Sequence, residues 1–406
     1  MMRSIQAMLA TTIAIAGCAA SPNIQSTEEA SIAAEPQVPE LAWPFQNMDQ
    51  IFPIAIVDRG TMPVDDLATS EIDLSQITFT NTAGETAGLE DLLSGSEVDA
   101  LVIVHDGDVI FEHYAHGQTQ ETRHIVYSVT KSFTALLAEL LINDGVLDES
   151  APLSTYVPEL IGSAYGDATL RQALNMQVGA DFSEDYDDPN SSIAQFARAA
   201  GISPRADGET GPDSLHDYLP TIAKKGEHGG PFHYNTATTE VVGWVIERAA
   251  EKTVPELLSE RIFSKIGAEH DAYFLAADTN QTAMAGGGLN ITARDLARLG
   301  LLILRDGRGP SGDIVIPKAT IEAIRSADLS LGDWAVPGGT STYRSFWYVN
   351  KPDRITTAYG IHGQALYVSP NGKLVAVMQS SNELAEGDFF VDFEFLSNAI
   401  SNHFDD

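Results

Sequence analysis

Two β-hairpin signals lie far apart in this chain of 406 residues. In the run LVIVHDGDVIFEHYAHG, which begins at residue 101, two β-rich segments flank Asp106-Gly107; in ALYVSPNGKLVAVMQSS, from residue 365, the turn falls at Asn371-Gly372. Asp-Gly and Asn-Gly between β-rich runs are typical of hairpins. Because strands lie early and late with helical patterns between them, we expect an α+β fold. It would have one antiparallel sheet, built from both ends of the chain and flanked by helices, and a mainly helical insertion over about 127–285.

Helical patterns fill much of the remaining sequence. After Ser128, apolar residues recur at helical spacing until Asn143-Asp144-Gly145 ends the run. In ITARDLARLGLLILRDG, Thr292 is a candidate N-cap with Asp295 three residues later. Two further segments, TTEVVGWVIERAAEKT and VDFEFLSNAISNHF, also predict helices.

The start of the first of these helices carries the clearest chemical signal. Ser128 and Lys131 are three residues apart, so they share a helix face, and the hydroxyl and the amine can come within reach of each other. A serine in the first turn also lies among unpaired backbone N–H groups at the positive end of the helix dipole, where an oxyanion would be stabilised. The pair is therefore a candidate nucleophile and base.

A Ser-x-x-Lys spacing alone is equally compatible with a capping serine and a solvated lysine. Two observations favour the interpretation as a nucleophile and a base. Ser128 and Lys131 form the only such spacing in the chain, and the helix that they open is strongly apolar. We therefore expect Lys131 to be partly desolvated, which makes a lysine lose its proton more easily and lets it act as a base near neutral pH.

Composition is that of an ordinary globular protein, with 44% hydrophobic and 20% charged residues. The formal net charge is −34, which argues against nucleic-acid binding because that requires clustered positive charge. We interpret the acidity as a contribution to solubility.

The N-terminal segment is interpreted as a targeting signal rather than as part of the fold. Arg3 precedes a short apolar run, and Ile15-Ala16-Gly17-Cys18 looks like a bacterial lipobox, in which the cysteine is lipidated and becomes the mature N-terminus. Cys18 is the only cysteine. We predict a lipoprotein signal peptide over 1–17, a flexible tether over 18–45 and a catalytic domain over 46–406, with the protein periplasmic and lipid-anchored to the cell envelope, at the outer membrane. The alternative is an ordinary cleaved secretory signal with an incidental cysteine.

Further motifs give the sequence a family resemblance. Tyr234 stands just before a predicted helix, and Gly360-Ile361-His362-Gly363 just before a predicted strand. Ser-x-x-Lys, a tyrosine before a helix and a Gly-rich segment before a strand follow one another in penicillin-recognising serine hydrolases. Over about residues 100–400 the sequence resembles that superfamily, and more narrowly the 6-aminohexanoate-dimer hydrolases and family VIII-type esterases. The closest stretches include YVPELIGSAYGDATLRQALNMQVGADFSEDYDDP and AGGGLNITARDLARLG.

The resemblance implies a β-lactamase/transpeptidase-like fold and hydrolysis of a small amide or ester without a cofactor. It also implies roles for individual residues. Ser128 would be the acylated nucleophile, with Lys131 as the base and Tyr234 as the proton shuttle to the leaving group. The backbone N–H groups of Ser128 and Ile361 would form the oxyanion hole. The substrate-side residues would be Tyr186 and, as a weaker candidate, His362.

Some positions depart from the superfamily pattern. Thr236 stands where Tyr-x-Asn usually has its asparagine, and the literal Tyr348 to Asn350 match lies far downstream, which suggests a chance match. Ala358-Tyr359-Gly360 replaces the Lys-Ser/Thr-Gly that holds a β-lactam carboxylate, so antibiotic hydrolysis is not expected. Ala197 occupies a position where some members carry an aspartate near the substrate amine.

Other kinds of site are weaker candidates. His228-Gly229-Gly230-Pro231 resembles the oxyanion loop of α/β-hydrolases, but the chain has no Gly-x-Ser-x-Gly, so a Gly-rich turn is the better interpretation. His113 and His116 lack a carboxylate partner motif, and we predict no metal site. Besides the serine hydrolase, a catalytically silent cell-envelope protein that binds peptides or peptidoglycan on the same fold stays open.

Overall fold

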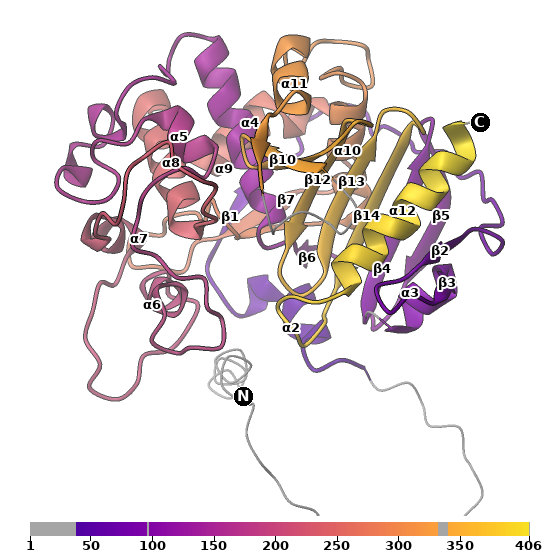
Figure 1. Cartoon of the computed structure of the whole chain (residues 1–406), viewed down its shortest axis with the longest axis horizontal. Coiled ribbons are helices and arrows are strands. Elements are labelled where there is room, and N and C mark those ends of the chain that lie inside the picture. Colours follow the sequence, from indigo (N-terminus) through magenta and orange to yellow (C-terminus); the bar gives the residue numbers. More distant parts are fainter. Residues whose placement is uncertain (1–37, 96, 332–339, 406) are drawn as a thin grey trace, which may run out of the picture.

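The computed structural model describes residues 38–95, 97–331 and 340–405. Its main sheet has eight antiparallel strands in the order β5-β4-β14-β13-β12-β11-β10-β9 (Figure 1). The two predicted hairpins supply half of these strands: β4 (Val98–His105), β5 (Asp108–Tyr114), β13 (Gln364–Ser369) and β14 (Leu374–Ser380). Strand β4 pairs with β14, with Ile103 opposite Ala376. The prediction of a sheet built from both ends of the chain is confirmed.

The turn of the first hairpin explains its strong sequence signal. Asp106 and Gly107 have φ angles of 49° and 102°. A two-residue turn with positive φ at both positions matches the right-handed twist of the flanking strands, and aspartate and glycine tolerate that conformation best.

The central strands are apolar on both faces. Along β4, Val102 and Val104 belong to the large core that includes the helical part of the molecule, whereas Leu101 and Ile103 belong to a second, smaller core. Because successive side chains point to opposite faces, a strand buried on both sides reads as a continuous apolar run.

Helices cover both faces of this sheet. The C-terminal helix α12 (Phe389–Asp405) crosses one face diagonally (Figure 1) and buries Phe393 and Leu396 in the smaller core. On the other face, α10 (Ala293–Leu304) approaches β14 closely, since a Cβ atom on Gly300 would lie 2.6 Å from Val375 Cγ1. Helix α4 (Val129–Asn143), with thirteen buried residues, joins the same core.

Among the described residues, seven further helices lie mostly between the two hairpins, and five of them fall within the predicted insertion over 127–285. They are α3 (Leu89–Gly95), α5 (Leu170–Leu174), α6 (Ser192–Ala199), α7 (Leu215–Tyr218), α8 (Thr236–Ala250), α9 (Val254–Arg261) and α11 (Lys318–Arg325). The other strands of the main sheet are β9 (Leu329–Ser330), β10 (Thr340–Arg344), β11 (Trp347–Lys351) and β12 (Ile355–Gly360).

A second sheet, which the sequence did not predict, has four short strands in the order β1-β7-β8-β6. They are β1 (Ile54–Val57), β7 (Ala272–Leu275), β8 (Leu289–Ile291) and β6 (His124–Ile125). A two-stranded sheet, β2 (Thr78–Thr80) with β3 (Thr86–Gly88), completes the set. Pairing of Ile125 with Asn290 brings the segment before Ser128 beside the segment after Gly288. The small sheet therefore positions the start of α4.

The N-terminal boundary of the folded domain lies earlier than predicted. Helix α2 (Ala42–Gln46) overlaps the end of the expected tether over 18–45, and Leu41 and Phe45 are buried in the large core. Burial of these apolar side chains removes them from water and stabilises the domain. The folded domain therefore includes them, and any tether ends before Leu41. The predicted signal over 1–17 and Cys18 lie outside the described residues. Within the described ranges, no helix is both long and apolar enough to cross a membrane.

Candidate active site

Ser128 follows a constrained turn between β6 and α4. The preceding residue, Tyr127, has a φ of 41°, a conformation that non-glycine residues rarely adopt and that costs of order 1–3 kcal/mol. A hydrogen bond of 2.9 Å from Val126 N to Leu289 O holds the turn, and the Tyr127 ring packs against Phe45. The small sheet and α2 thus fix where the Ser128 hydroxyl points.

Lys131 lies one turn into α4 and faces the Ser128 hydroxyl. Its side chain is buried, with the residue 1% exposed. The Nζ atom donates to Ser128 Oγ at 2.8 Å and to the carbonyl oxygen of Gly286 at 2.6 Å. The helical i, i+3 contact predicted from the sequence is therefore confirmed. The second partner of the Lys131 amine, Gly286, is distant in the sequence.

The surroundings of Lys131 favour its neutral form. Burial lowers the pKa of Lys131 to about 8, while the carboxylates of Glu184 and Glu240 oppose that change. Desolvation penalises the ammonium, and two nearby negative charges only partly compensate. The lysine can therefore accept a proton near neutral pH.

Tyr234 completes the group around Ser128. It directly precedes Asn235, the N-cap of α8, whose side-chain oxygen accepts from Thr238 N at 3.2 Å. The Lys131 Nζ atom lies 5.2 Å from the centre of the Tyr234 ring. Burial holds the pKa of Tyr234 well above its usual range, although its hydrogen bond with Ser128 opposes that rise. The phenol therefore keeps its proton and can pass it on.

Strand β12 ends beside Ser128. A Cβ atom on Gly360 would lie 2.4 Å from Val126 O and 2.9 Å from Ser128 N, so only glycine permits this approach. The next residue, Ile361, lines the same pocket as Ser128 and Tyr234. The structure thus brings together the two residues predicted to supply the oxyanion hole.

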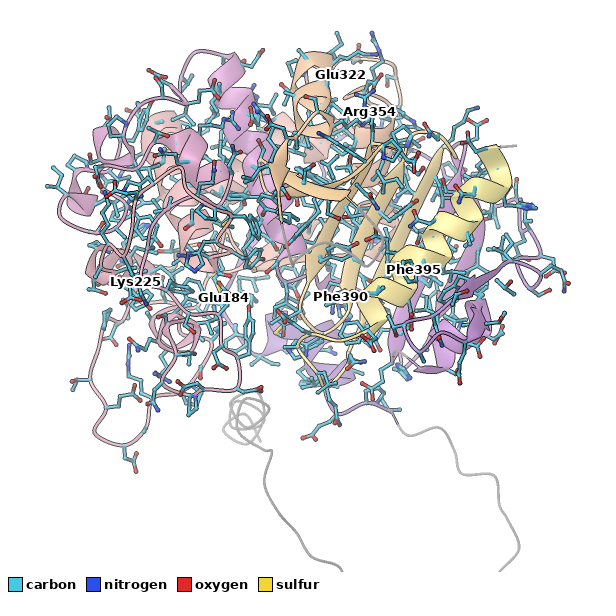
Figure 2. The ribbon with its side chains drawn as sticks, viewed as in Figure 1. Glu184, Lys225, Glu322, Arg354, Phe390 and Phe395 are labelled. Carbon is cyan, nitrogen blue, oxygen red and sulfur yellow. The ribbon has the colours of Figure 1, made fainter. Side chains whose placement is uncertain are left out.

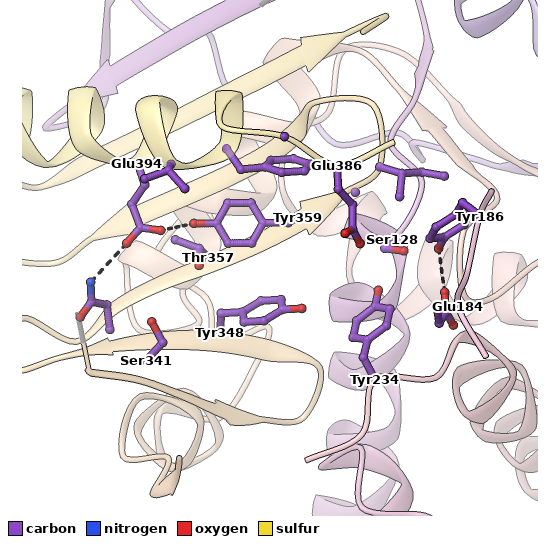
Figure 3. A pocket seen from close by; sticks show the side chains of 16 residues that line it. Ser128, Glu184, Tyr186, Tyr234, Ser341, Tyr348, Thr357, Tyr359, Glu386 and Glu394 are labelled. Atoms are coloured by element: carbon purple, nitrogen blue, oxygen red, sulfur yellow. Dashed lines mark hydrogen bonds between the residues drawn. The ribbon is translucent and has the colours of Figure 1, made fainter. Parts of the chain in front are cut away.

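These residues open onto a pocket of about 360 Å³ that extends from Ser128 toward α12 (Figure 3). Glu184, from the loop before α6, and Phe390, on α12, both line it from different parts of the molecule (Figure 2). The lining residues are Ser128, Glu184, Tyr186, Tyr234, Ser341, Tyr348, Asn350, Thr357, Tyr359, Gly360, Ile361, Glu386, Gly387, Phe390, Val391 and Glu394. These described lining residues include three carboxylates and no lysine, arginine or histidine.

Tyr186 lies in this pocket, as expected for a substrate-side tyrosine. Its hydroxyl donates to Glu184 Oε2 at 2.7 Å (Figure 3). Glu184 also accepts from the backbone N–H of Thr236 and from Thr236 Oγ1. The threonine that replaces the usual asparagine thus helps to fix a carboxylate that the sequence did not single out.

At the other end of the pocket, Glu394 projects from α12. Its carboxylate accepts from the Tyr359 hydroxyl and from Asn350 Nδ2 (Figure 3). Burial raises the pKa of Glu394. Tyr348 and Asn350, set aside as a chance match to Tyr-x-Asn, therefore do line the pocket, although the tyrosine beside Lys131 is Tyr234.

Two histidines weighed from the sequence lie elsewhere. His362 is not among the pocket-lining residues, because its Nδ1 is 2.8 Å from Asn382 O and its ring packs against Phe45 and Tyr127. Burial lowers the pKa of His362 to about 4. His116 hydrogen-bonds with Asp99, and the described residues contain no group of three or more His, Cys, Asp or Glu side chains placed to hold a metal ion. The structure therefore gives His362 a supporting position behind the Ser128 turn.

Sequence reasoning missed Glu240 as well. This glutamate lies on α8, is 3% exposed, and accepts backbone N–H groups from Ala285 and Gly286. Its signal in the sequence is an acidic residue on the buried side of an otherwise apolar helix, TTEVVGWVIE.

Comparison with known proteins identifies the family of this chain. A family model described as Beta-lactamase matches residues 92–399. The chain belongs to the beta-lactamase family. It is 32% identical over 370 residues to the 6-aminohexanoate-dimer hydrolase of Paenarthrobacter ureafaciens, which covers 89% of this chain and 89% of that protein. The predicted family resemblance is confirmed.

Solved structures that superpose on this chain confirm the fold. The "Putative 6-aminohexanoate-dimer hydrolase from Bacillus anthracis" superposes with a TM-score of 0.82 at 29% identity, covering 90% of this chain and 95% of that one. A family VIII carboxylesterase superposes with a TM-score of 0.57 at 16% identity, covering 76% of this chain and 95% of that one. The β-lactamase/transpeptidase-like α+β fold was therefore predicted correctly.

Proposed function

We propose that the protein is a serine hydrolase that cleaves small linear amides or carboxylic esters through an acyl-enzyme on Ser128. The observation that carries the proposal is the 2.8 Å hydrogen bond from Lys131 Nζ to Ser128 Oγ, at a pocket that Tyr234 and Ile361 also line. A nucleophile within hydrogen-bond reach of a buried base is the arrangement that nucleophilic catalysis requires. Similarity to a 6-aminohexanoate-dimer hydrolase supports the choice of linear amides.

The proposed reaction has two halves. Neutral Lys131 takes the proton from Ser128 Oγ as that oxygen bonds to the substrate carbonyl carbon, and the backbone N–H groups of Ser128 and Ile361 stabilise the resulting oxyanion. The bond to the leaving group then breaks, and Tyr234 gives its proton to the departing amine or alkoxide while it takes the proton held by Lys131, so that both side chains return to their starting forms. Water attacks the acyl-enzyme in the second half, which releases the carboxylic acid and returns the proton to Ser128.

Charge in the pocket argues against β-lactams. Glu184, Glu386 and Glu394 line it, and Tyr359 occupies the segment where the superfamily has its Lys-Ser/Thr-Gly. A substrate carboxylate would need a cationic partner, which the described lining does not offer. Linear substrates that bring an uncharged or cationic group into this pocket are therefore favoured over penicillin-like ones.

A fluorophosphonate probe tests the chemistry, and three substrates test the specificity. Mass spectrometry of the labelled protein should place the modification on Ser128. Steady-state assays should then detect turnover of p-nitrophenyl butyrate or of the linear 6-aminohexanoate dimer, with little turnover of nitrocefin. A protein that binds cell-envelope peptides without labelling or turnover would instead be the silent binding protein, and efficient nitrocefin turnover with inert ester and amide would overturn the proposed specificity.

A further inference from the structure

Glu240 is a carboxylate in the interior of the molecule. It lies in the middle of α8 and is 3% exposed. A buried charged group is costly unless hydrogen bonds and nearby opposite charge satisfy it. Its partners therefore indicate what the residue does.

Those partners form a continuous path to the nucleophile. Glu240 Oε2 accepts from Ala285 N at 2.9 Å, and Oε1 accepts from Gly286 N at 2.8 Å. The carbonyl oxygen of Gly286 in turn accepts from Lys131 Nζ at 2.6 Å. The approach is close, because a Cβ atom on Gly286 would lie 2.9 Å from Glu240 Oε1.

We propose that Glu240 is a positioning residue for this site: it fixes the Ala285–Gly286 backbone so that the Gly286 carbonyl oxygen holds the Lys131 amine against Ser128, and it supplies a counter-charge to that amine. The inference rests on the proposed roles of Ser128 and Lys131. Glu240 would not touch the substrate, since it acts through Gly286 and is not among the pocket-lining residues.

The charged and titratable groups around the pair define its pH behaviour. Lys131 faces Ser128, Tyr234, Glu184 and Glu240. Glu240 faces Lys131 and Glu247, and His216 borders the small space beside it. Burial raises the pKa of Glu240 to about 7, close to the value of about 8 for Lys131. The charge of each group also shifts the pKa of the other, so the protonation of Lys131 depends on the charge of Glu240.

Replacing the Glu240 carboxylate by an uncharged amide distinguishes an effect on Lys131 from a purely structural role of this residue. Reaction requires neutral Lys131, so the rate rises with pH through the pKa of this lysine. In Glu240→Gln, the carboxylate of Glu240 no longer stabilises the Lys131 ammonium, and only that of Glu184 remains, so the pKa of Lys131 should fall. We expect the acidic limb of the Ser128 labelling rate to move about one unit or more to lower pH, as for loss of a neighbouring opposite charge.

Glu247→Gln is the matched control. Glu247 lies on the same helix and also accepts a backbone N–H, from Val254 at 2.9 Å in a part-buried hydrogen bond. Its loss should leave the acidic limb near the wild-type position. If Glu240→Gln and Glu247→Gln give the same limb as wild type, or the same shift as each other, Glu240 is only structural and the proposal is overturned.

Gly286→Ala tests the contact between Gly286 and Glu240 without changing any charge. It is the second variant to measure if Glu240→Gln does not fold. The added methyl group pushes the segment away from Glu240, so the maximal labelling rate should fall at least tenfold in folded protein. A rate within twofold of wild type would overturn the proposal. If wild-type protein is not labelled at Ser128 at any pH, the proposed function itself fails, and the role of Glu240 falls with it.

Discussion

Gly360 and Ser128, far apart in the sequence, are in backbone contact: a Cβ atom built on Gly360 would lie 2.9 Å from the backbone nitrogen of Ser128. The contact joins the end of β12 in the main sheet to the start of α4. It places Ile361 beside the nucleophile, where its backbone N–H is proposed to stabilise an oxyanion.

Gly360→Ala should therefore reduce activity by about 10²-fold or more, the usual effect of losing one oxyanion-hole donor. The added Cβ would meet Val126 O at 2.4 Å, so the strand end and the Ser128 turn must separate. Steady-state kinetics on folded protein measure the effect. Gly95→Ala is the control, since, apart from its chain neighbours and the backbone of its own helix, no described residue has an atom within 4 Å of a Cβ atom built there. Unchanged kinetics in Gly360→Ala would exclude Ile361 from the oxyanion hole.

Ser128→Ala should lose covalent labelling and at least about 10⁴-fold in turnover, because the acyl intermediate is proposed to form on this hydroxyl. Its circular dichroism spectrum should match that of wild type. Ser132→Ala is a suitable comparison, since Ser132 lies on the same helix but donates to Phe346 O at 2.7 Å. That variant should still be labelled. Full activity in Ser128→Ala would remove the basis of the proposed mechanism.

Lys131 should set the acidic limb of the pH–rate profile. Its pKa is lowered to about 8, so the neutral, active form is only about a tenth of the protein at pH 7, and the rate should rise until pH passes 8. Lys131→Ala should cost several orders of magnitude, and Lys131→Arg should not restore activity because guanidinium stays protonated. An active arginine variant would mean that this position contributes only positive charge.

Tyr186→Phe should distinguish amides from esters. The Tyr186 hydroxyl donates to Glu184 at 2.7 Å, which leaves its oxygen free to accept from a substrate amide N–H. Loss of one such hydrogen bond should lower amide turnover up to about tenfold. Ester turnover should stay within twofold, because an ester has no N–H to donate. Equal losses for both substrates would contradict a contact specific to amides; Tyr156→Phe, outside the pocket lining, serves as a control.

Cys18 leads to a prediction about localisation. We propose that it is lipidated and holds the protein at the outer membrane, facing the periplasm, because it follows Ile15-Ala16-Gly17 in a lipobox-like segment. Cys18→Ser should release the protein into the soluble periplasmic fraction or block its processing. Wild-type protein that already fractionates as soluble would favour an ordinary cleaved signal instead.

The sequence by itself determined the features that depend on neighbouring residues. The Asp106-Gly107 turn, the helix after Ser128 and the Thr292 N-cap follow from local conformational preferences and hydrophobic spacing. The second hairpin also forms as predicted, although its turn covers residues 370–373 and the positive φ lies at Lys373. The Ser128–Lys131 contact was predictable for the same reason, since i and i+3 always share a helix face. Family motifs added Tyr234 and Ile361, both of which the structure places at the pocket.

Only the tertiary structure decided what surrounds these residues. The four-stranded sheet has strands too short for a recognisable pattern, yet its pairing of Ile125 with Asn290 brings Gly286 within reach of Lys131. The carboxylates of Glu184 and Glu394 look like any other acidic residues in a chain with 57 of them, and the place of Glu240 in an apolar helix does not reveal its partners. Their roles come from burial and from partners distant in sequence, and these depend on how sheets and helices pack rather than on local spacing.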